Sequence, residues 1–199
     1  MSHTRESFRL CSLSALALAM PLVALANADV EKNIADSKNW AVQAGDEFNH
    51  RYSQLNQINA GNVGKMQVAW TFSTGVLRGH EGSPLVIGDT MYLHSPFPNK
   101  VFAIDLNTQK ILWKYEPKQD PAVIPQMCCD TVNRGLAYAE GKVFLQQADS
   151  TLVALDAKTG NRIPSFGSPF FTDHTTLPLL ASSATSVESA CCRNTLPSA

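Results

Sequence analysis

The sequence predicts an all-β protein, a partial β-propeller made of the first blades of a larger ring. The segment that begins at Leu136 repeats the pattern of the segment that begins at Pro84, about 50 residues earlier. Both segments alternate apolar and β-branched residues between turns and lack helical periodicity. Strand repeats of this length are typical of propeller blades, and a closed ring needs roughly four to eight of them. A β-sandwich of hairpins is the alternative, but a sandwich does not require a repeated Asp, Thr and Trp frame.

Each repeat unit consists of strand pairs closed by turns. In PLVIGDTMYLHSP the strands flank Gly88-Asp89, and in KVFAIDLNTQKILWKYEP they flank Asn107-Thr108. The second unit, LAYAEGKVFLQQADSTLVALDAKTG, follows the same plan. The matched triplets are Met91-Tyr92-Leu93 with Val143-Phe144-Leu145, and Ala103-Ile104-Asp105 with Ala154-Leu155-Asp156.

A tryptophan closes the first unit and is missing from the second. Trp113 lies in the closing strand ILWKY, and the matching position of the second unit holds Pro164. A flat aromatic side chain there would wedge between blades, whereas proline lacks that surface and removes a ladder donor. The run VAWTF at residues 68–72 resembles ILWKY, which predicts an earlier partial copy that ends there.

The predicted opening blades span residues 29–160, and residues 29–38 are expected to form a short helix that leads into them. From about Asn161 the composition shifts to Ser, Thr, Pro and Leu, and the strand alternation ends. We interpret residues 161–199 as an atypical tail, frame-shifted or disordered. A genuine Ser/Thr/Pro-rich extension is the alternative.

Residues 1–28 have the features of a secretory signal peptide. Arg5 and Arg9 precede an apolar stretch, and small residues at Ala24, Ala26 and Ala28 offer cleavage sites. A membrane span is the alternative, but serines and a proline interrupt the stretch and the polar run DVEKN follows it. The expected location is therefore the periplasm, after cleavage of the leader.

Cleavage would remove Cys11 and leave four of the five cysteines, in two vicinal pairs at 128/129 and 191/192. Three connectivities are then possible, and an oxidising compartment fits all of them. A bridge between Cys128 and Cys129 would be strained, because adjacent Cα atoms lie about 3.8 Å apart and ordinary disulfides span roughly 4.4 to 6.8 Å. Such strain usually serves a site. Separate distant partners, or none, are the alternative.

Composition excludes one class of partner and leaves the histidines without a metal pattern. The chain has 199 residues, 17% of them charged, and a net charge of −1, so nothing in it favours nucleic acid. His80 and His94 have no second ligand at a recognisable spacing, which favours loop or strand-face histidines over metal ligands.

Several segments together resemble one enzyme family. NWAVQAGDEFNHRYSQLNQIN, WTFSTGVLRGHEGSPLVIGDTMY, HSPFPNKVFAIDL, WKYEPKQDP and MCCDTVNRGLAYAEGKVF resemble the amino-terminal part of the large subunit of PQQ-dependent methanol dehydrogenases, nearly continuously over residues 40–160. The amino-acid sequence at residues 118–121 and 147–149 is more similar to the lanthanide-dependent branch than to the calcium-dependent one. The resemblance implies an eight-bladed propeller that holds pyrroloquinoline quinone (PQQ) above a bound metal ion, Ca²⁺ or a lanthanide.

The resemblance also implies a set of cofactor-binding residues. Cys128 and Cys129 match a vicinal disulfide that packs against one face of the quinone. Arg134 matches an arginine at the polar edge of the quinone, and Glu81 matches a glutamate that hydrogen-bonds to it. Taken singly, Arg134 and Glu81 read as surface residues; with the cysteine pair at the family spacing, the binding roles are favoured. No catalytic residue and no metal ligand can be placed, because in the family they come later in the chain.

The implied reaction is oxidation of a primary alcohol, methanol foremost, to an aldehyde, with electrons passed to cytochrome c. The full protein is expected as a homodimer or a complex with a small subunit, and this chain alone is expected to be inactive. Three alternatives remain: a PQQ enzyme for a longer alcohol, a non-catalytic propeller of the outer-membrane assembly type, and a defective gene product.

Overall fold

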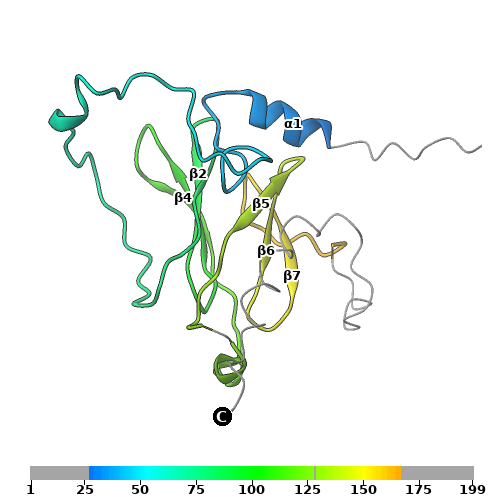
Figure 1. Cartoon of the computed structure of the whole chain (residues 1–199). Helices are drawn as coiled ribbons and strands as arrows, with labels where there is room; N and C mark the ends of the chain where they lie inside the picture. The colour runs from blue at the N-terminus through cyan, green and yellow to red at the C-terminus, as the bar shows by residue number, and fades with distance from the viewer. Residues whose placement is uncertain (1–26, 128, 167–199) are drawn as a thin grey trace, which may run out of the picture.

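The computed structural model describes residues 27–127 and 129–166 (Figure 1). The predicted signal peptide up to residue 26, Cys128, and the predicted tail from residue 167, which includes Cys191 and Cys192, lie outside the described residues. Within the described ranges no helix is long and apolar enough to cross a membrane. The elements are α1 (Ala28–Ala35), η1 (Val63–Lys65), β1 (Leu85–Ile87), β2 (Thr90–His94), β3 (Val101–Asp105), β4 (Ile111–Tyr115), η2 (Pro121–Gln126), β5 (Leu136–Ala139), β6 (Lys142–Gln146) and β7 (Leu152–Asp156).

The strands form two antiparallel sheets, which confirms the all-β prediction. The first sheet, in the order β1-β2-β3-β4, is the first repeat unit, and its turns lie at Gly88-Asp89 and Asn107-Thr108 as expected. The second sheet, in the order β5-β6-β7, is the second unit. Figure 1 shows the two sheets side by side, with α1 across one end and η2 at the opposite end.

The repeated Asp and Thr stabilise the turn after the third strand of each unit. Asp105 Oδ1 accepts a hydrogen bond from the Thr108 amide at 2.7 Å. Asp156 Oδ1 accepts from the Thr159 amide and from the Thr159 hydroxyl, both at 2.9 Å. Because these bonds favour the ionised carboxylates, they lower the pKa of Asp105 and of Asp156 below the ordinary value.

The hydrophobic core lies between the sheets and takes side chains from both of them. Trp113 of β4 is only 8% exposed, and its indole Nε1 donates to the Ala157 carbonyl at 2.9 Å. A Cβ at Gly160 would lie 2.5 Å from the indole ring, so the ring rests on the Asp-Thr-Gly turn of the second sheet. The tryptophan wedge predicted between blades is confirmed. Tyr92 donates to the same carbonyl at 3.1 Å, and burial raises its pKa to about 12.

The second sheet has three strands within the described residues, against four in the first. After β7 the backbone turns back beside it: the Ile163 amide donates to the Ala154 carbonyl at 2.9 Å, and Arg162 forms a bridge with Leu155. Pro164 follows directly. The backbone after β7 thus starts along the path expected of a fourth strand, but the structure assigns no strand there. No aromatic side chain occupies the position that Trp113 holds in the first sheet.

Two amino-terminal segments flank the sheets. The predicted helix is α1, whose N-cap is Asn27, and Trp40 extends the edge of the first sheet through a bridge to Val86. Residues 48–77 form a long loop beside the first sheet (Figure 1). In this loop Trp70 and Phe72 are half-buried, and Phe72 meets Phe102 of β3 edge-on at 5.1 Å. The structure assigns residues 68–72 to no strand, although their sequence resembles the closing strand ILWKY.

Candidate functional site

Two loops bring two of the predicted cofactor-binding residues together. Glu81 lies on the loop that precedes β1, and Arg134 lies on the loop between η2 and β5. Arg134 Nη1 is 3.1 Å from Glu81 Oε2, and their side chains are 43% and 46% exposed. The Glu81 carboxylate and the Arg134 guanidinium, which lie on separate loops, thus form one accessible ion pair.

A second ion pair runs beside the first and ties the same loops. Arg78 Nη1 lies 3.4 Å from Asp130 Oδ1, and the Gly79 amide donates to Asp130 Oδ2 at 3.4 Å. The amides of Thr131 and Gly79, together with the Arg78 charge, lower the pKa of Asp130. Since an isolated exposed pair contributes only about 0–1 kcal/mol, we read the two pairs as setting loop position rather than as a large source of stability.

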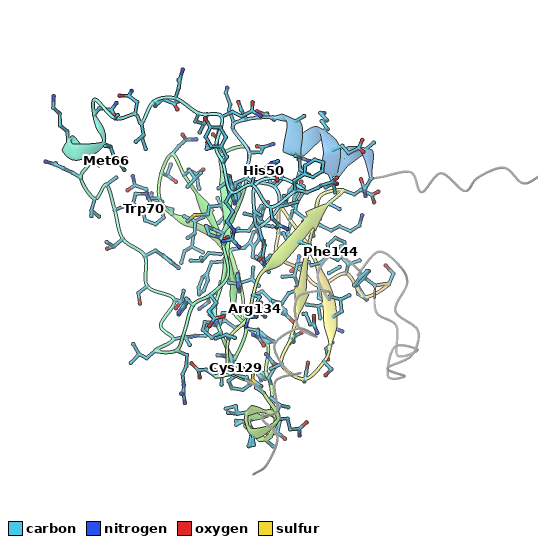
Figure 2. The ribbon with its side chains drawn as sticks, viewed as in Figure 1. His50, Met66, Trp70, Cys129, Arg134 and Phe144 are labelled. Carbon is cyan, nitrogen blue, oxygen red and sulfur yellow. The ribbon has the colours of Figure 1, made fainter. Side chains whose placement is uncertain are left out.

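The cysteine position lies on the same loop as Arg134. Figure 2 shows Cys129 and Arg134 toward the η2 end of the sheets, whereas His50 lies toward the α1 end. Cys129 is exposed and adopts φ +64°, and Asp130 follows with φ +74°. Residues other than glycine rarely adopt this left-handed backbone conformation, which costs on the order of 1–3 kcal/mol per residue. Residues in such conformations cluster at functional sites. The predicted bridge involves Cys128, so it lies outside the described residues and stays a prediction.

The backbone around Arg134 is fixed by neighbours that the sequence did not single out. The side-chain amide Nε2 of Gln43 donates to the backbone carbonyl of Arg134. Gly135 has φ +153°, and a Cβ there would overlap the Gln43 side chain, so glycine is required at this close approach. His94 Nε2 donates to the Asn133 carbonyl at 3.0 Å. No sequence signal pointed to Gln43, because its partner is a backbone carbonyl that every residue carries.

The two histidines considered as metal ligands have other partners. His80 contacts the Thr74 hydroxyl at 2.9 Å and the Arg78 carbonyl at 2.8 Å. His94 is buried and bonded as above. Among the described residues no group of three or more His, Cys, Asp or Glu side chains could hold a metal ion.

The arrangement suits a ligand with carboxylate or carbonyl groups at its edge. The Arg134 guanidinium can donate paired hydrogen bonds to a carboxylate or carbonyl edge, and Glu81 can accept from protonated polar groups.

A hollow of about 200 Å³ lies elsewhere, under α1. It is lined by Glu31, Ile34, Ala35, Asp46, Glu47 and Phe48.

Comparison with known proteins gives consistent relatives. Residues 40–176 match the family model described as the glucose/ethanol/alcohol dehydrogenase β-propeller domain, PQQ type. The chain is 66% identical over 146 residues to a lanthanide-dependent methanol dehydrogenase of Methylorubrum extorquens, covering 73% of this chain and 24% of that protein. It is 44% identical over 173 residues to subunit 1 of the methanol dehydrogenase [cytochrome c] of Paracoccus denitrificans, covering 80% and 27%.

A solved structure shows the same relationship. A europium-containing methanol dehydrogenase superposes with a TM-score of 0.66 at 49% identity, covering 68% of this chain and 24% of that one. The chain therefore spans about a quarter of the length of the relatives it matches.

Proposed function

This chain belongs to the PQQ β-propeller family of glucose, ethanol and alcohol dehydrogenases, and we propose that it supplies the opening blades and part of the cofactor site of a methanol dehydrogenase. The observation that carries the proposal is the convergence of Glu81 and Arg134 at 3.1 Å on an accessible surface, with exposed Cys129 on the same loop as Arg134. The identity of 66% to a lanthanide-dependent relative favours that branch, with a lanthanide or Ca²⁺ as the metal ion.

Each residue has a distinct proposed task. Arg134 binds carboxylate or carbonyl oxygens at the cofactor edge and neutralises negative charge there. Glu81 orients the guanidinium and accepts a hydrogen bond from the cofactor. Cys128 and Cys129, if bridged, form a polarizable apolar platform for one face of a planar ring. When bound, PQQ supplies the two-electron acceptor for oxidation of a primary alcohol to an aldehyde.

The remaining assignments extend to the whole enzyme. We propose that metal ligands and catalytic groups lie on other blades, that cytochrome c accepts the electrons, and that the enzyme forms a homodimer or binds a small subunit. Export to the periplasm through the leader at residues 1–28 is part of the same proposal, as is the atypical tail from residue 161.

The proposal is tested by titrating PQQ into the full chain, with Ca²⁺ or La³⁺ present, and following cofactor absorbance. Arg134→Gln is expected to weaken binding about tenfold or more, because it removes a charge-assisted contact. Arg51→Gln removes an exposed arginine outside both loops and is expected to have little effect. Equal losses in the two variants would contradict the assignment of Arg134. A methanol-dependent rate of dye reduction by the chain alone would contradict the proposal that it lacks the catalytic groups.

A further inference from the structure

A buried histidine lies directly beneath the two loops that carry Glu81 and Arg134. His94 is the last residue of β2 and is 4% exposed. A Cβ at Gly82 would overlap the His94 ring, so the loop that carries Glu81 crosses the ring in contact with it. On the other loop, the Asn133 carbonyl accepts from His94 Nε2 at 3.0 Å. One ring therefore touches the residue next to each member of the ion pair.

The hydrogen bond defines which ring nitrogen carries a proton. A carbonyl only accepts, so Nε2 must be protonated. Nδ1 is buried and has no hydrogen-bond partner among the described residues, which suits an unprotonated nitrogen better than an N–H group left without an acceptor. Burial lowers the pKa of His94 by more than the hydrogen bond to the Asn133 carbonyl raises it, and His80 lowers this pKa further. The ring is therefore neutral near pH 7.

The Asn133 side chain transmits this anchoring to the neighbouring backbone. Its Nδ2 donates to the Gln146 carbonyl of β6 at 2.8 Å, and its Oδ1 accepts from the Gly135 amide at 3.0 Å. Asn133 thus joins the Arg134 loop to the second sheet, while His94 joins the same loop to the first sheet. The position of Arg134 depends on both sheets through these bonds.

We propose that His94 is a positioning residue that holds the Glu81 and Arg134 loops in register through contact with Gly82 and the bond to the Asn133 carbonyl. The significance of this role rests on the proposed cofactor site. It also predicts a pH response. Protonation would add a positive charge that His80 disfavours, and it would leave an Nδ1–H without an acceptor among the described residues. The loops that contact the ring also carry the charged side chains of Glu81 and Arg134, which pair with each other.

The sign of the response follows from the lowered pKa. The unfolded or opened state takes up a proton near the ordinary value of 6.5, before the folded state does. Anchoring of the two loops is therefore complete above about pH 6.5 and weakens as the pH falls through the pKa of the folded state.

Hydrogen exchange tests this on the full chain without cofactor. Peptides covering residues 78–83 and 129–136 are followed from pH 5 to pH 8 after correction for intrinsic rates, with residues 142–156 as internal reference. His94→Phe keeps a ring but no donor, and we expect about tenfold faster exchange in both loops and unchanged exchange in the reference. His94→Gln keeps a donor but cannot titrate, and we expect near wild-type protection with no pH step. His80→Gln, the matched control, is expected to retain the step.

Each outcome decides the proposal. Unchanged loop exchange in His94→Phe, or a wild-type pH step in His94→Gln, would overturn it. If His94→Phe unfolds throughout, the His94→Gln profile alone decides. A PQQ titration separates this inference from the proposed function: failure of the wild-type chain to bind PQQ counts against the function and leaves the exchange result standing. If PQQ binds, His94→Phe is expected to raise its Kd about tenfold and His94→Gln to leave it nearly unchanged.

Discussion

The two sheets share a repeat but differ in how they meet a neighbour. In the first sheet the closing strand β4 carries Trp113, which packs on Gly160 and donates to the Ala157 carbonyl of the second sheet. In the second sheet the matching position holds Pro164, with no aromatic ring to offer. The first sheet is therefore attached to the second through an aromatic side chain of its fourth strand, which packs on the Asp-Thr-Gly turn of the second sheet.

Removing the wedge should have the largest effect. Trp113→Ala is expected to lower the free energy of unfolding by about 3–5 kcal/mol, since it opens a cavity between the sheets and leaves the Ala157 carbonyl with one donor fewer. Urea denaturation measures the change. Leu112→Ala, in the same strand but 54% exposed, is expected to cost less than about 1 kcal/mol. Similar losses in the two variants would show that Trp113 does not attach the blades.

The surface that receives the wedge can be tested separately. Gly160→Ala is expected to cost about 2–3 kcal/mol, because it combines a left-handed φ of +72° with a Cβ that meets the indole ring. Gly141→Ala is the matched control: its φ is +70°, and nothing lies within 4 Å of the added Cβ. It should cost only about 1–2 kcal/mol. The difference between the two denaturation midpoints isolates the contact with Trp113, and equal midpoints would contradict it.

The turn below the wedge should make stability depend on acid. Hydrogen bonds from Thr159 and Lys158 lower the pKa of Asp156 below the ordinary 3.8. The contribution of the Asp156 carboxylate to the stability of the fold is therefore fully present above about pH 4, and it is lost as the pH falls through the pKa of Asp156 in the folded state. In Asp156→Asn, the melting temperature should depend less on pH below pH 4 than it does in the wild type. Asp89→Asn, at an exposed turn of the first sheet, should keep the wild-type slope, and a flattening in both would point to general charge effects.

Restoring the missing aromatic should have the smallest effect. Pro164→Trp places tryptophan where the first sheet has it, but within the described residues no third blade offers a turn to receive the ring. We expect the free energy of unfolding to change by less than about 0.5 kcal/mol, as for an ordinary surface substitution. A gain of more than about 1 kcal/mol in urea denaturation would show that a lone blade benefits from its fourth-strand aromatic.

The repeat could be predicted because its physics is local. Strand alternation, the turns at Gly88-Asp89 and Asn107-Thr108, and the Asp-Thr bonds all form within a few residues of one another, so spacing reveals them. The contact of Trp113 with the next sheet was also predictable, because a large aromatic side chain in the closing strand of a repeat is expected to bury its surface against the neighbouring unit. The path of residues 68–72 was only partly predictable: their resemblance to a closing strand does not state which strand would pair with them.

The candidate site was predictable only through the family resemblance. Nothing in the spacing of Glu81 and Arg134 indicates that their loops converge at 3.1 Å. His94 was set aside because it lacks a second metal ligand, and its true partner is a backbone carbonyl, which leaves no trace in the sequence. The sequence also gives no sign that Asp130 and Arg78 form an ion pair, which depends on the fold bringing their loops together.

If the loops of Glu81 and Arg134 form part of a PQQ site, backbone amide shifts in the ¹⁵N-labelled chain will report the binding. On titration with PQQ we expect the largest shifts in residues 79–83 and 129–135, with saturation at a common Kd. Shifts confined to the hollow under α1, at residues 31–35 and 46–48, or no saturable shifts at all, would contradict the proposed site.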